Sequence, residues 1–411
     1  MNLTPDVLIV GGGPAGLAAA RQFATRGIDN VLVVEREAEA GGIPRFCPHP
    51  TFGVTDFFRP MSGPSYAALW RQNVDPAKIA TSTTVTRIAR DGAVTVSTPE
   101  GEAVLLPRRV LIATGIRERS RAARLVSGDR PRNVLTTGAL QRLIAEGRPL
   151  PFRRPVVVGS EMIAFSAALS LRDHAIRPVA MLEAGERTVS IGPGALFART
   201  VLRTSVLFGH RLLAINAAPG DAAAVDSVTV ESASGRRDIG CDAVIFTGEF
   251  VPETSVLSGL AGLVAPGSLG AAVDQSWRTP DAAIYAAGNV LRGVETAAWS
   301  AREGAAAADA IADDLGGLGR GGRRVPIDIA GPIRLLIPSA LSLPVGRLGP
   351  LQMQVRMARS ATGHFSLSAD GTEIWRSGRL TLHPERRHGL SRRLPPLDKV
   401  QKLTLCFIEE A

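Results

Sequence analysis

The sequence predicts an α/β protein with two doubly wound, Rossmann-like domains plus a small C-terminal β-rich domain. Near the N-terminus, a buried strand runs into a glycine-rich turn and a helix. The same unit recurs about 150 residues later, and the last ninety or so residues hold short alternating apolar runs between prolines. The 411 residues are enough for two or three domains.

The first unit occupies residues 6–35. Val7–Val10 is a short β-branched run, which is typical of a parallel strand buried on both faces. The glycines after it fill G-x-G-x-x-G positions, which allow a tight turn, close approach of a pyrophosphate and close packing of the next helix. That helix, predicted over 14–26, points its positive end at the phosphates. The positions expected to contact the dinucleotide here are Gly11, Gly13, Pro14, Ala15 and Gly16.

A second strand, Val31–Val34, ends in Glu35. This acid lies 24 positions after Gly11 (35 − 11), where a carboxylate is expected to bind ribose hydroxyls. Arg36 follows it as a further candidate cofactor contact. Strand, glycines, helix, strand and acid in this order predict a dinucleotide site, whereas a lone glycine motif would not.

The second unit repeats this order with one change. Pro155–Val158 leads into Gly159, a helix is predicted over Met162–Asp173, and a strand over 177–182 precedes Glu183, again 24 positions on (183 − 159). Glu161 stands where the first unit has its second glycine, so a Cβ and a carboxylate oppose a pyrophosphate there. We favour a fold that binds no nucleotide. NAD(H) in a shifted pose and a different ligand remain the alternatives.

The motifs divide the chain into parts. We expect a discontinuous first domain (1–115 and 284–315), a connector (116–150), a degenerate second domain (151–283), a glycine-rich linker (316–322) and a C-terminal β-rich domain (323–411). The runs that predict strands in this last domain are 333–337, 351–357, 365–367, 372–375 and 403–408. Asp370-Gly371 is a hairpin turn signal, and Trp375 is a candidate anchor for assembly.

Composition narrows the function classes. The net charge is +9, of which residues 321–411 contribute +7 (14 Lys/Arg against 7 Asp/Glu), so an acidic partner, an anionic lipid surface or only solvent could face this domain. Aromatic residues are 5% of the chain, which disfavours nucleic-acid recognition by stacking. The sequence has no predicted transmembrane segment, and peripheral membrane contact stays open.

Cysteine and histidine usage adds three expectations. Cys47, Cys241 and Cys406 lie far apart without a C-x-x-C pair, so we do not expect a redox dithiol. Three scattered cysteines are typical of a protein in the reducing cytoplasm, which is the location we expect. The histidines show no metal-ligand spacing, so no metal site is predicted.

The motif order resembles that of two-dinucleotide-domain flavoproteins, a family that includes thioredoxin-reductase-like and glutathione-reductase-like enzymes. The matching features are the N-terminal glycines, a strand over 110–113 that closes in Ala113-Thr114-Gly115, and the segment 284–289. The resemblance implies bound FAD, with NAD(H) doubtful because of Glu161. It implies that Gly42, Ala113, Thr114, Gly115, Gly288, Asn289, Glu295 and Thr296 contribute to binding FAD. The family usually has Asp where this chain has Asn289.

Residues 41–67 look similar to the FAD-containing α-type subunits of sarcosine oxidase-like, opine oxidase-like and proline dehydrogenase-like complexes. This implies an FAD-dependent oxidoreductase subunit that oxidises a small amine, imino acid or related substrate by hydride transfer to flavin. Electrons would pass to a partner subunit, quinone or O₂. Several relatives carry a cysteine-rich iron–sulfur module, which the C-terminal ninety residues here lack, having only Cys406.

Three side chains in this segment are candidates for chemistry. Arg45 or Arg59 would bind a substrate carboxylate, and His49 would act as a general base. Local ion pairing and loop hydrogen bonding are equally good interpretations of all three. Cys47 is expected to be a packed residue. The rival functions are an NAD(P)H-dependent flavin reductase or acceptor oxidoreductase, a nucleotide sensor and a non-catalytic flavin-holding subunit.

Overall fold

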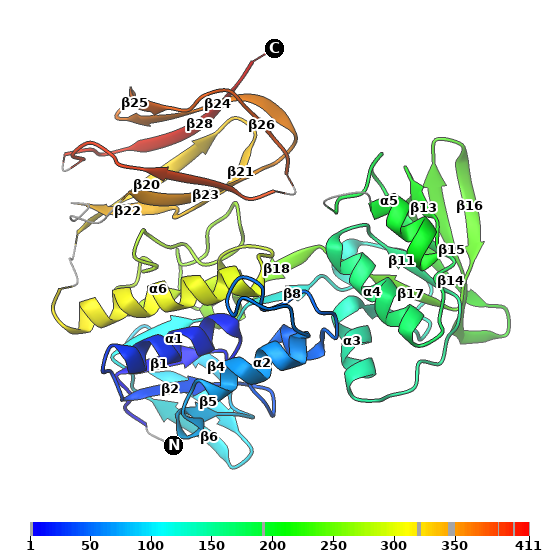
Figure 1. Cartoon of the computed structure of the whole chain (residues 1–411), viewed down its shortest axis with the longest axis horizontal. Coiled ribbons are helices and arrows are strands. Elements are labelled where there is room, and N and C mark those ends of the chain that lie inside the picture. Colours follow the sequence, from blue (N-terminus) through cyan, green and yellow to red (C-terminus); the bar gives the residue numbers. More distant parts are fainter. Residues whose placement is uncertain are drawn as a thin grey trace.

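The first domain is built on a parallel sheet in the order β19-β7-β1-β2-β3 (Figure 1). The computed structural model describes residues 3–190, 194–318, 322–343, 350–384, 386–397 and 399–410. The strands are β1 (Val7–Val10), β2 (Val31–Val34), β3 (Ile79–Ala80), β7 (Arg109–Ile112) and β19 (Ile284–Ala286). Short apolar runs form them because both faces of the sheet are covered.

Helices α1 (Pro14–Thr25) and α6 (Ala297–Leu315) cover one face of this sheet, and α2 (Gly63–Gln72) packs beside α1. An antiparallel sheet covers the other face, formed by β4 (Thr84–Ile88), β5 (Val94–Thr98) and β6 (Gly101–Leu105). The carboxyl ends of β1, β7 and β19 and the first turns of α1 and α6 therefore meet at one edge, where ligands of such sheets bind.

The second domain repeats this design with the sheet order β10-β17-β11-β12-β13. Its strands are β10 (Val134–Thr136), β11 (Pro155–Val158), β12 (Ala180–Glu183), β13 (Val206–Phe208) and β17 (Ala243–Phe246). Helices α3 (Thr137–Ala145), α4 (Met162–Asp173) and α5 (Gly194–Phe197) belong to this domain. A further sheet has the order β16-β15-β14-β9, with β9 (Ser127–Gly128), β14 (Arg211–Ala218), β15 (Asp221–Ser232) and β16 (Gly235–Gly240).

Two segments lie differently from the predicted domain limits. Strand β10 and helix α3 fall in the range expected to be a connector, yet β10 pairs with β17 in the second sheet. After β17, the chain forms β18 (Phe250–Pro252), which pairs with β8 (Ile116–Glu118) to link the domains. Residues 257–273 then pack Leu257, Leu260 and Leu263 into the core of the first domain.

The C-terminal domain consists of two packed sheets that stand over α6 (Figure 1). The larger has the order β22-β20-β28-β24-β25, with β26 also paired to β24, and the smaller has the order β21-β23-β27. The strands are β20 (Arg323–Ala330), β21 (Ile333–Ile337), β22 (Ala340–Leu343), β23 (Leu351–Met357), β24 (Ala361–Ala369), β25 (Thr372–Arg376), β26 (Leu380–Leu382), β27 (His388–Arg392) and β28 (Leu403–Glu409).

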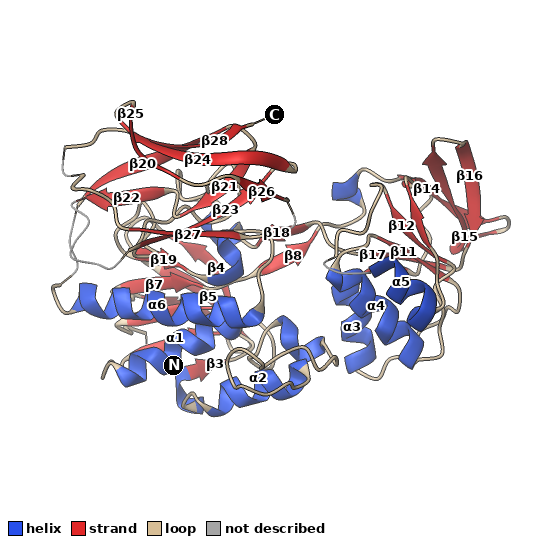
Figure 2. Cartoon of the chain, turned by 45° about the horizontal axis from the view of Figure 1, so that its top comes forward, coloured by secondary structure: helices blue, strands red, loops and turns tan. Residues whose placement is uncertain are grey.

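The predicted fold class is confirmed, with two Rossmann-like sheets and a β-rich C-terminal domain (Figure 2). Asp370 and Gly371 both have positive φ and join β24 to β25, as the turn signal predicted. Residues 319–321 of the predicted linker lie outside the described residues. Trp375, the predicted anchor, stacks under the Arg392 guanidinium within its own domain. No helix in the described ranges is long and apolar enough to cross a membrane.

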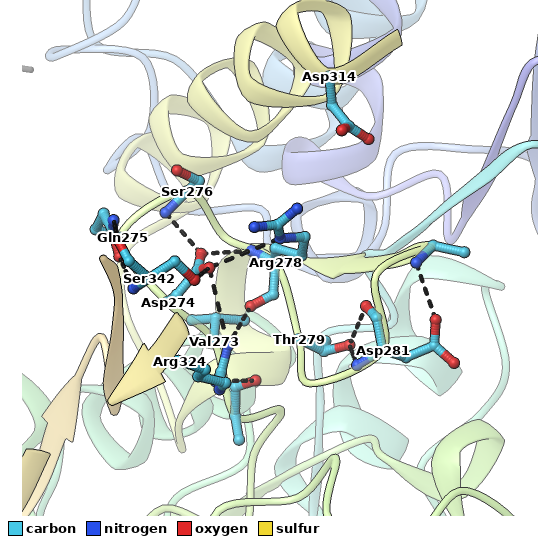
Figure 3. A network of polar contacts seen from close by, with 12 residues as sticks. Val273, Asp274, Gln275, Ser276, Arg278, Thr279, Asp281, Asp314, Arg324 and Ser342 are labelled. Atoms are coloured by element: carbon cyan, nitrogen blue, oxygen red, sulfur yellow. Dashed lines mark hydrogen bonds and ion pairs between the residues drawn. The ribbon is translucent and has the colours of Figure 1, made fainter. Parts of the chain in front are cut away.

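A buried aspartate fastens the C-terminal domain to the first domain (Figure 3). Asp274 accepts hydrogen bonds from the backbone N–H groups of Ser276 and Arg278, and from the Ser342 hydroxyl of β22 at 2.6 Å. Gln275 exchanges two hydrogen bonds with the backbone of Ser342. Arg324 of β20 lies 3.9 Å from the Asp274 carboxylate. We call these contacts the Asp274 anchor.

Candidate functional site

Two glycine turns meet at the N-terminus of α1. Gly41 donates its backbone N–H to the carbonyl oxygen of Gly12 at 2.6 Å, and a Cβ on Gly42 would lie 3.0 Å from the Cα of Gly13. A Cβ on Gly13 would meet nothing closer than the Cα of Gly42, at 3.9 Å. No side chain caps α1 at Gly13 in the described structure. The turns therefore form an open cradle of backbone N–H groups at the positive end of a helix.

Glu35 holds this cradle in shape. Its side chain is buried at the end of β2, where Oε2 accepts the N–H of Gly12 at 2.8 Å and Oε1 accepts the N–H of Glu37 at 2.9 Å. Each carboxylate oxygen keeps a further lone pair, so a ribose contact of Glu35 is chemically possible and stays a prediction. Arg36 is exposed, with its Nε 3.9 Å from the Glu37 carboxylate.

The other side of the cradle comes from β7 and β19. Ala113 follows β7, and the Thr114 hydroxyl donates to the carbonyl oxygen of Glu253 at 2.6 Å. Gly115 has φ +74°, and a Cβ there would point into open space. Gly288, with φ +81°, donates its N–H to the Glu303 carboxylate at 3.2 Å. The structure thus brings the predicted motifs of three separate segments to one edge of the sheet.

Asn289 bridges the turn that leads into α6. Its Oδ1 accepts the N–H of Glu295 at 2.7 Å, and its Nδ2 donates to the carbonyl oxygen of Glu295 at 3.2 Å. An aspartate would only accept, so the Asn289 amide makes a bond, as donor, that an aspartate at this position could not make. Thr296 caps α6 by accepting the N–H of Trp299 at 3.2 Å. Ser300, in the next turn, has a buried hydroxyl with no partner among the described residues.

The two candidate arginines differ in their surroundings. Arg45 lies in the turn η1 (Ile43–Phe46), donates to the carbonyl oxygen of Glu39 at 2.7 Å and pairs with its carboxylate at 3.3 Å. Local pairing therefore occupies Arg45. Arg59 lies on an exposed loop next to Phe58, whose side chain is 91% exposed. Among the described residues, Arg59 has no acidic partner.

His49 and Cys47 face the second domain. The Nε2 of His49 lies 3.3 Å from the Ser170 hydroxyl of α4, and burial lowers the pKa of this imidazole. Cys47 is buried with its Sγ 3.5 Å from the Gln141 amide oxygen of α3, and burial raises its pKa to about 12. The structure thus places both residues in the contact between the domains. Among the described residues, no group of three or more His, Cys, Asp or Glu could hold a metal ion.

In the second domain, the Glu161 side chain occupies the position that corresponds to the open space at Gly13. Its Oε2 accepts the Thr247 hydroxyl at 2.9 Å, and a Cβ on either Gly159 or Gly248 would overlap its carboxylate. Burial raises the pKa of Glu161, against the effect of its hydrogen bonds. Arg124 lies beside it and donates to the carbonyl oxygens of Thr247 and Gly248.

Glu183 is also engaged. Its carboxylate accepts the Ser160 hydroxyl and the N–H of Gly185. The acid predicted to bind a ribose in the second unit is therefore held by its own turn. The first cradle is open where the second is filled by side chains.

Sequence reasoning missed the residues behind Gly288. Glu303 is 4% exposed and accepts hydrogen bonds from Gly288, Arg292, Trp299 and Gln354. The sequence signal that could have pointed to Glu303 is that it is a single glutamate within an alanine-rich helix. Its partner Gln354 is 51 residues away in sequence, and no local pattern connects the two.

Comparison with known proteins agrees with this geometry. A family model described as pyridine nucleotide-disulphide oxidoreductase matches residues 5–304. An opine oxidase subunit from Agrobacterium tumefaciens (strain Ach5) is 27% identical over 337 residues, which cover 74% of this chain. The chain spans 65% of the length of that relative.

Solved structures share the fold. Thioredoxin reductase from T. acidophilum is similar with a TM-score of 0.62 and 20% identity, covering 76% of this chain and 99% of that one. L-Proline dehydrogenase from P. horikoshii has a TM-score of 0.57 and 18% identity, covering 77% of this chain and 56% of that one.

Proposed function

Because the chain belongs to the pyridine nucleotide-disulphide oxidoreductase family, we propose that it is an FAD-dependent subunit that oxidises a small amine, imino acid or related organic substrate. The family binds FAD, and binds NAD(P) as well. When bound, FAD accepts a hydride, which is the chemistry that this oxidation needs. The likeness to a protein named as one of the subunits of opine oxidase supports both the substrate class and the presence of a partner.

The observation that carries the proposal is the contrast between the two glycine turns. A Cβ on Gly13 would have room beside uncapped helix N–H groups, whereas the Glu161 carboxylate fills the matching place in the second domain. A pyrophosphate fits the first turn and would meet a carboxylate in the second. FAD therefore belongs to the first domain, and a nicotinamide dinucleotide is not the expected electron acceptor.

The open cradle fits the proposed cofactor. The backbone around Gly11, Gly13 and Gly42 would hold the pyrophosphate, with Glu35 on the adenosine ribose. Gly115, Gly288 and the first turn of α6 would face the flavin side. The orphaned Ser300 hydroxyl, 3.7 Å from a Cβ built on Gly288, supports a polar ligand there.

Disulphide exchange, the chemistry in the family name, has no support in this chain. All three cysteines of the sequence lie among the described residues as free thiols. Burial raises the pKa of Cys47 and of Cys241 to about 12, and exchange needs a thiolate.

On the substrate side, we propose Arg59 as the residue that binds a carboxylate, because it is exposed and lies in the segment 41–67 that follows the cradle in the sequence. Arg45 and His49 would act by shaping this loop, since Glu39 and Ser170 contact them. A guanidinium binds a carboxylate through two parallel N–H bonds.

The decisive experiment is anaerobic reduction of the purified protein with a panel of amines, amino acids, hydroxy acids, NADH and NADPH. We expect yellow protein that releases FAD, and bleaching by an amine or imino-acid substrate rather than by either nicotinamide. Fast bleaching by NADH or NADPH would overturn the proposal in favour of a nicotinamide-dependent reductase. Flavin that bleaches only after a partner is added would identify a flavin-holding subunit.

The substitution Gly13→Ala tests the cradle itself. The added methyl meets no atom closer than 3.9 Å, so the fold is preserved while the phosphate space is reduced. We expect FAD affinity to fall about 10- to 100-fold, by analogy with the loss of one or two good contacts. Circular dichroism checks the fold, and Gly389→Ala, at an exposed site with nothing within 4 Å, is the matched control.

A further inference from the structure

The turn 288–296, which leads into α6, is held by the C-terminal domain. Gln354 of β23 donates to the Glu303 Oε1 at 2.7 Å, and Arg292 and Trp299 donate to the same oxygen at 2.7 and 2.8 Å. The other oxygen of Glu303 accepts the N–H of Gly288. One buried carboxylate thus connects β23 to the glycine that faces the cradle.

Two arginines of the C-terminal domain hold the other end of this turn. Arg356 of β23 donates to the carbonyl oxygen of Val294 at 2.8 Å and to the Glu295 carboxylate at 2.6 Å. Arg387 reaches the same carboxylate at 3.4 Å and lies 3.5 Å above the Trp299 ring centroid. These are charge-assisted contacts to a side chain that is 7% exposed.

The backbone between these contacts is strained. Val294 has φ +96°, a conformation that a β-branched residue rarely adopts. Such a conformation persists where its surroundings impose it, and it clusters at ligand sites. Arg356 holds the carbonyl of Val294, and Asn289 holds the next residue from the other side.

We propose that Gln354, Arg356 and Arg387 are positioning residues for the cofactor, so that docking of the C-terminal domain sets the geometry of the 288–296 turn and the affinity for FAD. The inference rests on the proposed function in one respect, the identity of the ligand. It gives the C-terminal domain a specific task in this chain.

The Asp274 anchor provides a matched control. It also joins the C-terminal domain to the first domain, through Ser342 and Gln275, but no bond in the described structure links it to Gly288 or Glu295. If these residues only hold the C-terminal domain in place, weakening the Asp274 anchor and weakening the contacts around Glu295 and Glu303 should have the same effect on FAD binding. A positioning role predicts that only the contacts around Glu295 and Glu303 affect the cofactor.

The test compares wild type with Gln354→Met, Arg356→Met, Arg356→Lys and the control Ser342→Ala. Hydrogen exchange of the apo-protein measures the exchange rate of the Gly288 amide. Titration with FAD gives the Kd and the visible spectrum of the bound flavin. We expect Gln354→Met to speed Gly288 exchange and Arg356→Met to raise the Kd for FAD, each about tenfold, the cost of one lost charge-assisted bond. Arg356→Lys should recover part of the affinity. Ser342→Ala should lower Tm but change Kd less than twofold.

A double-mutant cycle tests the strain. Glycine tolerates the backbone of Val294, so Arg356→Met should weaken FAD binding less in a Val294→Gly background than alone. Equal effects of both attachments, or an unchanged Kd and spectrum in all variants, would overturn the inference while leaving the proposed function intact. A wild-type protein that binds no FAD would instead overturn the proposed function, and the assignment to FAD with it.

Discussion

Glu161 shows how one residue changes the chemistry of a repeated fold. Its half-buried carboxyl group lies between Gly159, Gly248 and the Thr247 hydroxyl, and this burial raises its pKa. A group whose pKa is higher in the folded state stabilises the fold below its unfolded pKa, near 4.5. That stability is lost as the pH rises through the folded pKa.

Glu161→Gln should therefore stabilise the protein, because the amide keeps a hydrogen bond to Thr247 and stays neutral at every pH. We expect the Tm of the variant relative to wild type to increase as the pH rises from about 4.5, the ordinary range of a glutamate. Differential scanning calorimetry from pH 4 to 8 measures this. The exposed Glu186 is the control, since Glu186→Gln changes the net charge equally. A constant difference in Tm across this range would contradict the prediction.

Residue identity at the site was predictable only where the signal is local. Gly11, Gly13, Gly16 and Glu35 follow from spacing within thirty positions. The partners that Glu303 and Glu295 find in the C-terminal domain were not, because Gln354 and Arg387 lie 51 and 92 positions away in the sequence. The side-chain hydrogen bonds of Asn289 also depend on the conformation of the turn 288–296, which cannot be read from its sequence.

At the scale of elements, helices α1 and α6 contact each other closely at Gly304, which has no side chain. A Cβ on Gly304 of α6 would overlap the carbonyl oxygen of Ala15 in the first turn of α1. This close crossing brings the first turns of both helices to the cradle. Alanine is the better helix former by about 1 kcal/mol, so propensity alone favours Gly304→Ala.

We expect the packing effect to prevail. Gly304→Ala should destabilise the fold by about 1–3 kcal/mol, the usual cost of overpacking a buried site. Urea unfolding followed by tryptophan fluorescence gives the free energy. Gly389→Ala, in an exposed strand with free space, should stay within about 0.5 kcal/mol of wild type. A more stable Gly304→Ala variant would show that the helices separate easily.

Element prediction succeeded where a buried strand meets a glycine turn. The bounds of β1, β2, β11 and α4 agree with the sequence. The strand predicted over 177–182 begins later, at Ala180, because Pro178 has no N–H for a strand that pairs on both sides. Strands β8 and β18 were missed because they are short and pair across more than 130 residues.

At the scale of the whole molecule, the first and second domains are joined by contacts beside the cradle as well as by β8 and β18. Arg142 of α3 binds the Glu37 carboxylate with both terminal nitrogens, at 3.1 and 2.9 Å. Cys47 contacts Gln141 of the same helix. The Cys47 thiol is therefore covered by the second domain, and its reactivity reports on separation of the two domains.

Arg142→Ala should make Cys47 react faster with a thiol reagent. A half-exposed ion pair contributes about 0.5–1 kcal/mol, which corresponds to a two- to fivefold larger open population. Alkylation at fixed pH, followed by mass spectrometry of the Cys47 peptide, measures the rate. Arg148→Ala is the control, because Arg148 pairs only with Glu146 in the described structure and does not reach the first domain. Equal Cys47 rates in both variants would mean that the Arg142–Glu37 ion pair does not help to hold the two domains together.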